Sequence, residues 1–149
     1  MPRTIDQIAA AFAALQPSDF DNEAAGICKL HELTDELLAL PHSEQAIPAI
    51  FDIVERMPDV EMGTPGPLVH TLEQMRGRYE HELVESIKRK PACLAIWMVN
   101  RIINGTHDLE QRQFYMDLLQ FAADHPAATE YARHEAQHFI KYQNQRKAV

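Results

Sequence analysis

The apolar residues of this chain recur every three or four positions, which is the spacing of one buried face of an α-helix. No stretch shows the period-two alternation of a half-buried strand bounded by hairpin turns. The segment around which the rest is expected to pack is residues 91–104, which contain the only tryptophan, Trp97, and almost no charge. Its apolar side chains cover nearly the whole circumference, which predicts a helix surrounded by other helices. Pro91 suits its first position, and Asn104-Gly105 predicts a left-handed stop.

Seven further helices are predicted from the same spacing. Thr4 and Gln7 form a capping box for the first helix, and prolines at positions 17, 41 and 58 end the first three. The predicted starts are Thr4, Ser18 or Asp21, Ser43, Thr64 and Tyr79 before the central segment, and Thr106 and Pro126 after it.

These elements predict an all-α fold of about eight helices, in which short connections favour antiparallel neighbours. A chain of 149 residues fits one domain, so we expect a single all-α domain over residues 1–149. Residues 39–57 and 86–103 share the same order of features, in which a helix end is followed by a proline and then by an apolar helix. This order suggests a right-handed stack of the HEAT or armadillo kind around the buried central helix.

The charge is strongly negative and unevenly distributed. The formal net charge is −8, which argues against nucleic acid or an anionic membrane as the main partner and favours a basic protein. Residues 1–62 hold 12 Asp and Glu against 3 Lys and Arg, whereas residues 63–149 hold 10 against 11. The acidity therefore belongs to the N-terminal part.

A cytoplasmic location is expected from the cysteines and the apolar runs. Cys28 and Cys93 lie far apart without ligand spacing, which is typical of a reducing compartment. The N-terminus has no apolar signal core, and the longest uncharged apolar run, residues 92–99, is too short to span a bilayer.

Two motifs suggest metal chemistry. His134-Glu135-Ala136-Gln137-His138 matches the H-E-x-x-H pattern in which two histidines bind zinc and the glutamate activates water. A third ligand is required, yet residues 139–149 contain no His, Asp, Glu or Cys, and both histidines are predicted to face solvent. His107-Asp108 could join His70, His81 and Asp124 in a phosphohydrolase-like site, but Thr106-His107-Asp108 is better explained as the capped first turn of a helix. Neither motif is taken as a metal site.

No nucleophile, phosphate loop or cofactor motif is found, so the chain is not expected to be an enzyme. The remaining signal is a set of acidic residues on the second and third predicted helices and the turn after them. If those two helices pack antiparallel, their outward charges merge into one surface for a basic partner; the alternative is an ordinary solvated face. The candidate partner-binding residues are Glu32, Asp35, Glu36, Asp52, Glu55, Asp59 and Glu61.

Three segments resemble small α-helical, HEAT-like bacterial immunity proteins: residues 66–70 (GPLVH), 86–91 (SIKRKP) and 97–104 (WMVNRIIN). Members of that group are encoded beside secreted polymorphic or contact-dependent growth inhibition toxins. The resemblance implies a cytoplasmic protein that binds and neutralises one cognate toxin domain, often a nuclease, and carries out no reaction. It transfers no catalytic or binding residues to this sequence.

Two other functions remain open at this point. A HEAT-like adaptor in another assembly predicts no toxic gene neighbour and a more apolar groove. A zinc hydrolase predicts stoichiometric metal that is lost on His134→Ala.

Overall fold

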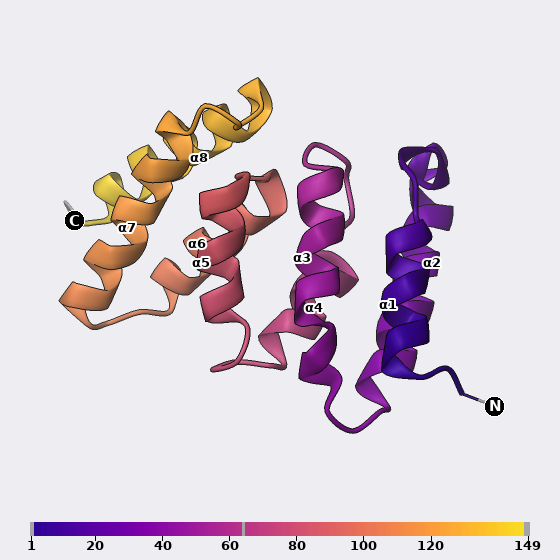
Figure 1. Cartoon of the computed structure of the whole chain (residues 1–149). Coiled ribbons are helices and arrows are strands. Elements are labelled where there is room, and N and C mark those ends of the chain that lie inside the picture. Colours follow the sequence, from indigo (N-terminus) through magenta and orange to yellow (C-terminus); the bar gives the residue numbers. More distant parts are fainter. Residues whose placement is uncertain (1, 64, 148–149) are drawn as a thin grey trace. The chain divides into compact units, whose positions relative to one another are not determined.

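A computed structural model describes residues 2–63 and 65–147 of the chain (Figure 1). These residues form eight α-helices and two short 3₁₀ helices, with no strand among them. The predictions of an all-α fold and of about eight helices are confirmed. The contacts divide the chain into two compact units, which we name the N-terminal unit (residues 1–82) and the C-terminal unit (residues 83–149). The single domain and the right-handed HEAT-like stack concern the whole chain and stay predictions.

The N-terminal unit contains α1 (Ile5–Ala14), η1 (Pro17–Phe20), α2 (Glu23–Leu38), η2 (Ser43–Ala46), α3 (Ile47–Arg56) and α4 (Gly66–Glu73). Helix α1 packs against both α2 and α3, and α2 packs against α4. Figure 1 shows α1 and α3 in front and α2 and α4 behind them. The side chains between these helices form a fully buried apolar core, which includes Phe12, Leu30, Phe51 and Leu68.

Local sequence explains where α1 and α3 begin. The capping box before α1 is present, because Thr4 Oγ1 accepts from the Gln7 N–H at 3.2 Å and Gln7 Oε1 accepts from the Thr4 N–H at 2.9 Å. The predicted helix start at Ser43 is wrong, since Ser43 begins η2 and α3 starts at Ile47. Pro48 explains the later start, because proline suits a first helical turn, where no N–H partner is needed. The predicted cap at Thr64 lies outside the described residues.

The C-terminal unit contains α6 (Cys93–Asn104), α7 (Leu109–Asp124) and α8 (Glu130–Lys147), each of which packs against the other two. Helix α5 (Glu80–Arg89) begins just before the boundary between the units. Asp108 caps α7 by accepting from the Glu110 N–H, but the predicted capped first turn at residues 106–108 is misplaced, because α7 begins at Leu109 and the Thr106 hydroxyl donates instead to the Ile102 carbonyl of α6. Among the helices described, none combines the length and apolar composition needed to cross a membrane.

Three details of the predicted central helix need correction. Helix α6 begins at Cys93 rather than Pro91, because Ala92 is extended, with φ −123° and ψ 153°. Gly105 ends the helix with φ −97°, so the predicted left-handed stop is absent. One side of the helix is buried, but Trp97 and Arg101 on another side are only half-buried. The apolar pattern therefore overstated how completely other helices surround α6.

A polar network joins α6, α7 and α8 within the C-terminal unit. Gln143 is fully buried, and its Nε2 donates to Asn100 Oδ1 at 2.7 Å and to Asn104 Oδ1 at 2.8 Å. Arg112 donates to Gln143 Oε1 at 3.2 Å and to the Gln143 carbonyl at 3.1 Å. Each helix thus supplies partners for the others, and no buried side-chain nitrogen or oxygen in the described chain lacks a hydrogen-bond partner.

Candidate functional site

The candidate acidic residues of α2 lie on its outer face. Glu32 and Asp35 are exposed, whereas Glu36 is half-buried and forms a two-pronged ion pair with Arg3, whose Nε lies 3.0 Å from Oε1. Hydrogen bonding to Arg3 lowers the pKa of Glu36, and the same bond, followed by the charges of Glu36 and Glu32, raises the pKa of Arg3. Arg3 therefore pairs with Glu36 and feels the charge of Glu32, two of the three candidate acids of this helix.

The remaining candidates lie on α3 and in the segment after it. Asp52 is exposed and pairs with Arg56 at 2.8 Å, and Glu55 is half-buried. Asp59 and Glu61 are exposed, and Glu61 accepts a hydrogen bond from a backbone N–H two residues later at 3.0 Å. These residues form a second acidic group, separate in sequence from that of α2.

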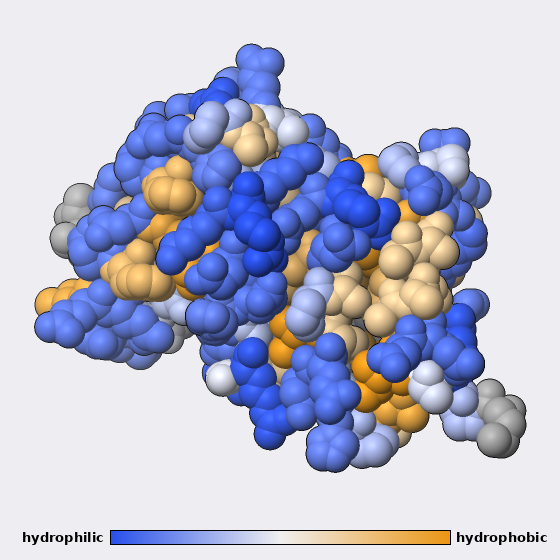
Figure 2. Space-filling model, in the orientation of Figure 1, coloured by the Kyte–Doolittle hydropathy of each residue, from blue (hydrophilic) through white to orange (hydrophobic). Residues whose placement is uncertain are grey.

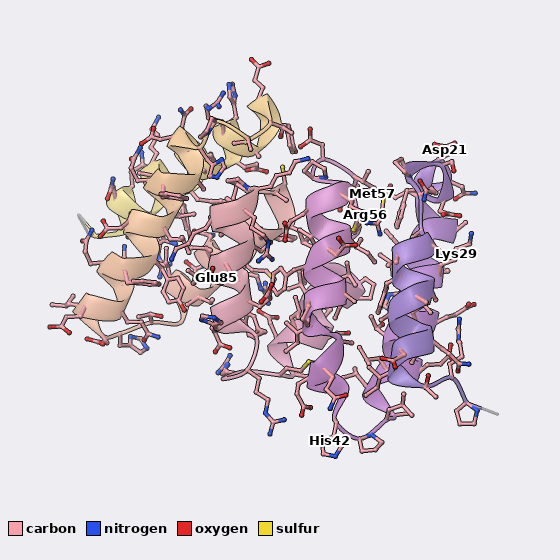
Figure 3. All side chains as sticks on the ribbon, in the orientation of Figure 1. Asp21, Lys29, His42, Arg56, Met57 and Glu85 are labelled. Carbon is pink, nitrogen blue, oxygen red and sulfur yellow. The ribbon has the colours of Figure 1, made fainter. Side chains whose placement is uncertain are left out.

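Arg56 also connects α3 to α1. Its two terminal nitrogens donate to the carbonyls of Leu15 and Phe12, each at 3.1 Å, at the C-terminal end of α1. A cation there compensates the negative end of the helix dipole. Figure 3 shows Arg56 at the end of α3, on the side of α1. Asp52 thus pairs with a side chain that the fold requires for its own packing.

The packing of these helices differs from the assumption behind the predicted merged surface. Helix α1 packs against both α2 and α3, and the main contacts of α2 are with α1, η1 and α4 rather than with α3. Glu36 of α2 pairs with Arg3, whereas Asp52 of α3 pairs with Arg56, so different cations hold the acids of the two helices. That these residues bind a partner stays a prediction.

The excess negative charge of the N-terminal unit is not compensated within the unit. Residues 1–82 contain 15 Asp and Glu against 5 Lys and Arg, a net charge of −10, whereas residues 83–149 contain 7 against 9. Four of the five cations form ion pairs: Arg3 with Glu36, Lys29 with Asp19, Arg56 with Asp52 and Arg78 with Glu44. Each of these cations is already engaged by one carboxylate, so the unit keeps a large excess of negative charge.

The Lys29–Asp19 pair adds an anchor between α2 and η1. Lys29 Nζ lies 2.7 Å from Asp19 Oδ1, and the other carboxylate oxygen accepts from the Gln16 N–H at 2.8 Å. These two hydrogen bonds, the one from Lys29 first, lower the pKa of Asp19. The acid is therefore part of the fold rather than of a free surface.

The H-E-x-x-H string lies on the outside of α8. His134 and His138 are both exposed, as predicted, and Glu135 is half-buried. Within residues 2–63 and 65–147, no group of three or more His, Cys, Asp or Glu side chains is placed to hold a metal ion.

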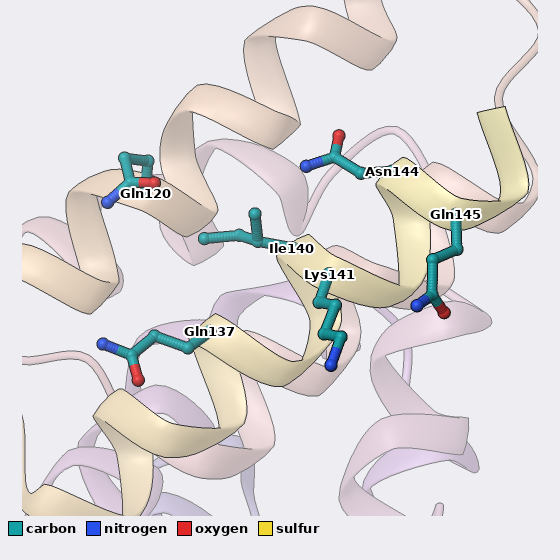
Figure 4. Close-up of a pocket in the computed structure, with 6 residues that line it drawn as sticks. All are labelled: Gln120, Gln137, Ile140, Lys141, Asn144 and Gln145. Carbon is teal, nitrogen blue, oxygen red and sulfur yellow. The ribbon is translucent and has the colours of Figure 1, made fainter. Parts of the chain in front are cut away.

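An open pocket of about 480 Å³ lies between α7 and α8 in the C-terminal unit (Figure 4). Its lining combines amide and ammonium groups with one aliphatic side chain: Gln120, Gln137, Ile140, Lys141, Asn144 and Gln145. These side chains include no carboxylate, thiol, hydroxyl or imidazole. The lining offers hydrogen-bond donors and acceptors but no pair of groups for acid–base chemistry.

Sequence reasoning missed a set of exposed apolar side chains in the C-terminal unit. Figure 2 shows separate apolar areas among hydrophilic residues in the region where Figure 1 places α7. The large exposed residues are Leu109, Phe114, Phe121, Tyr131 and Tyr142, with exposed fractions of 76%, 52%, 47%, 59% and 41%. The repeat of Gln-Phe-x-x-Asp at residues 113–117 and 120–124 is a signal that could have identified two of them.

Comparison with known proteins gives no family. No protein-family model matches the chain, and neither a search of curated proteins nor a search of solved structures finds a match. Function therefore has to be inferred from the residues themselves.

Proposed function

We propose that this chain is an immunity-type binding protein, which neutralises a basic toxin domain by covering it and catalyses no reaction. The observation that carries the proposal is the net charge of −10 on residues 1–82, with four of the five cations already paired inside the unit. The toxin itself is suggested by the sequence resemblance to immunity proteins.

The physical reason is electrostatic complementarity. An enzyme that acts on nucleic acid binds phosphate through Lys and Arg, so its active surface is positive. An acidic surface of matching shape accelerates encounter with such a protein and repels acidic competitors. The exposed carboxylates of Glu32 and Asp35 are the strongest candidates for this contact, because neither forms one of the ion pairs that hold the fold together, such as Arg3–Glu36 and Asp52–Arg56.

The function is tested in the cell that encodes the protein. We expect the gene immediately upstream to encode a secreted toxin, whose C-terminal domain stops growth when expressed alone. Co-expression of this chain should restore growth, and the two purified proteins should form a one-to-one complex. A harmless upstream product, or a toxin that this chain neither binds nor neutralises, would favour an adaptor role instead.

The contact surface is tested by charge reversal with a matched control. Glu32→Lys with Asp35→Lys should lower the association rate constant about tenfold at low salt and flatten its dependence on ionic strength. The control, Glu130→Lys with Glu135→Lys on α8, changes the net charge by the same amount and should alter that rate less than about twofold. Equal effects of the two variants would mean that total charge, rather than the surface of α2, governs association.

A further inference from the structure

Helix α7 carries the same five-residue pattern twice on its outer face. Gln-Phe-x-x-Asp occurs at residues 113–117 and again at residues 120–124, seven positions later. Seven residues are almost two helical turns, so the two copies project from the same face. Phe114 and Phe121 are therefore neighbours along one side of α7, and about half of each side chain is exposed.

Both phenyl rings are held in place by an adjacent ring. Phe114 meets the buried Tyr115 edge-on, with centroids 5.1 Å apart, and Phe121 meets His125 edge-on at 5.6 Å. His125 is itself fixed, because its Nδ1 accepts from the Ala127 N–H at 3.0 Å and its Nε2 lies 2.7 Å from a backbone carbonyl at the end of α5. Rigid aromatic side chains lose little entropy when they bind, so these rings are prepared for contact.

The carboxylates beside the rings are equally ordered. Gln113 Nε2 donates to Asp117 Oδ1 at 2.8 Å, and Gln120 Nε2 donates to Asp124 Oδ2 at 3.0 Å. Glu110 is exposed one heptad before Asp117, so three acids follow the same side of the helix. Each phenyl ring thus has one hydrogen-bonded carboxylate three residues after it, Asp117 for Phe114 and Asp124 for Phe121.

The only basic residue of α7 points away from this face. Arg112 donates to the side chain and backbone of Gln143 in the interior network. The charged residues that α7 itself contributes to this face are consequently all acidic, although Lys141 of α8 lines a pocket with Gln120 and the C-terminal unit as a whole has two more basic than acidic residues.

We propose that this α7 face, formed by Glu110, Phe114, Asp117, Phe121 and Asp124, docks a helix of a partner protein that repeats apolar residues every seven positions and flanks them with Lys or Arg. The heptad spacing of the two rings matches the repeat of a helix–helix seam. The flanking carboxylates select basic residues on the partner. A second copy of this chain is disfavoured at this face, because two α7 faces would bring six carboxylates together.

This inference is independent of the function proposed above. It concerns residues 109–125 of the C-terminal unit, whereas the proposed toxin contact lies on α2 of the N-terminal unit. An experiment that refutes one of the two proposed contacts therefore does not refute the other.

The experiment uses the full chain labelled with ¹⁵N and a synthetic helical peptide of about three heptads, with Leu at the seam and Lys beside it. A second peptide, in which every Lys is replaced by Glu, controls for apolar association alone. We expect the Lys peptide to perturb the amide signals of residues 109–125, and the Glu peptide to leave them unchanged.

Variants then test the rings and the charges separately. Phe114→Ala with Phe121→Ala should weaken binding of the Lys peptide at least about tenfold, because the anchors are removed. Tyr131→Ala with Tyr142→Ala removes two exposed aromatic side chains from α8 and should change the Kd less than about twofold. Asp117→Asn with Asp124→Asn should weaken binding at low salt and lessen its salt dependence.

Three results would overturn the proposal. The first is that the Lys peptide perturbs amide signals only in residues 2–82, which would place its binding site on the acidic N-terminal unit. The second is that the double variant Phe114→Ala with Phe121→Ala binds the Lys peptide as tightly as the natural chain does. The third is self-association of the chain that this double variant abolishes, which would make a second copy the occupant.

Discussion

Replacing Gln143 by leucine tests whether the polar network inside the C-terminal unit stabilises the fold. The side chain is fully buried and makes three side-chain hydrogen bonds, two as a donor to Asn100 and Asn104 and one as an acceptor from Arg112. Leucine has a similar size but can neither donate nor accept. The three partners therefore lose their contacts without a large cavity being created.

The magnitude follows from how well water can replace each lost bond. Asn100 is only 5% exposed, so its Oδ1 is left unsatisfied in the interior, whereas Asn104 is exposed and also accepts from Arg146. An orphaned buried acceptor costs about 1–3 kcal/mol, and the more accessible bonds contribute less. The apolar leucine offsets part of this loss, so we expect the free energy of unfolding to fall by about 2–3 kcal/mol.

The assay is urea unfolding followed by the fluorescence of Trp97, which is the only tryptophan and lies on α6 in the same unit. Gln145→Leu is the matched control, because the same substitution two positions later changes an exposed side chain and should alter stability by less than about 0.5 kcal/mol. If Gln143→Leu costs no more than Gln145→Leu, the network does not stabilise the unit and the reasoning is refuted.

Three further predictions concern the N-terminal unit. Arg56→Ala should lower the free energy of unfolding by about 1–2 kcal/mol, because two carbonyls at the end of α1 lose their donor. Arg56→Lys should recover less than half of this lost stability, because lysine cannot donate to both carbonyls in the same geometry. Full recovery in Arg56→Lys would show that only the positive charge matters. Gly26→Ala should destabilise by about 1–3 kcal/mol despite the better helix propensity of alanine, because its Cβ would lie 2.4 Å from the ring of Phe20; an unchanged urea midpoint would contradict this. Because the pKa values of Glu36 and Asp19 are lowered in the fold, their ion pairs stabilise it at pH values above the ordinary carboxyl pKa, and this stabilisation is lost as the pH falls below about 4. The urea midpoint measured from pH 6 to pH 3 should therefore fall less steeply for Glu36→Gln than for the natural chain.

The helices were predictable because their signals are local. The capping box of Thr4 and Gln7 depends on residues three positions apart and is present as expected, whereas the seventh helix begins two to three residues later than predicted because Asp108 rather than Thr106 caps it. The start of α6 was misplaced because it depends on the extended backbone of Ala92, which no side-chain pattern reveals. The stop at Gly105 was also wrong, since glycine permits a left-handed conformation without requiring one.

The candidate acidic site was harder to predict, because it depends on which helices are neighbours. The Asp52–Arg56 pair has i,i+4 spacing and is readable from the sequence, whereas Arg3 and Glu36 are 33 positions apart and meet only in the fold. The expectation of one merged surface assumed direct packing of α2 on α3, yet α1 is the helix that packs against both. Apolar stripes identify buried faces but do not say which two faces meet.

The exposed rings of α7 were visible in the sequence and were passed over for a physical reason. Residues 115, 118, 119 and 122 already account for the buried face of this helix, so Phe114 and Phe121 have no place in its core. Apolar residues left over after the core is filled are a reason to look for a partner. The chain then offers two anionic surfaces with different chemistry, one almost purely charged and one built on aromatic rings. Because salt screens charge but not apolar burial, a contact through α2 should weaken steeply as ionic strength rises, whereas a contact through α7 should persist.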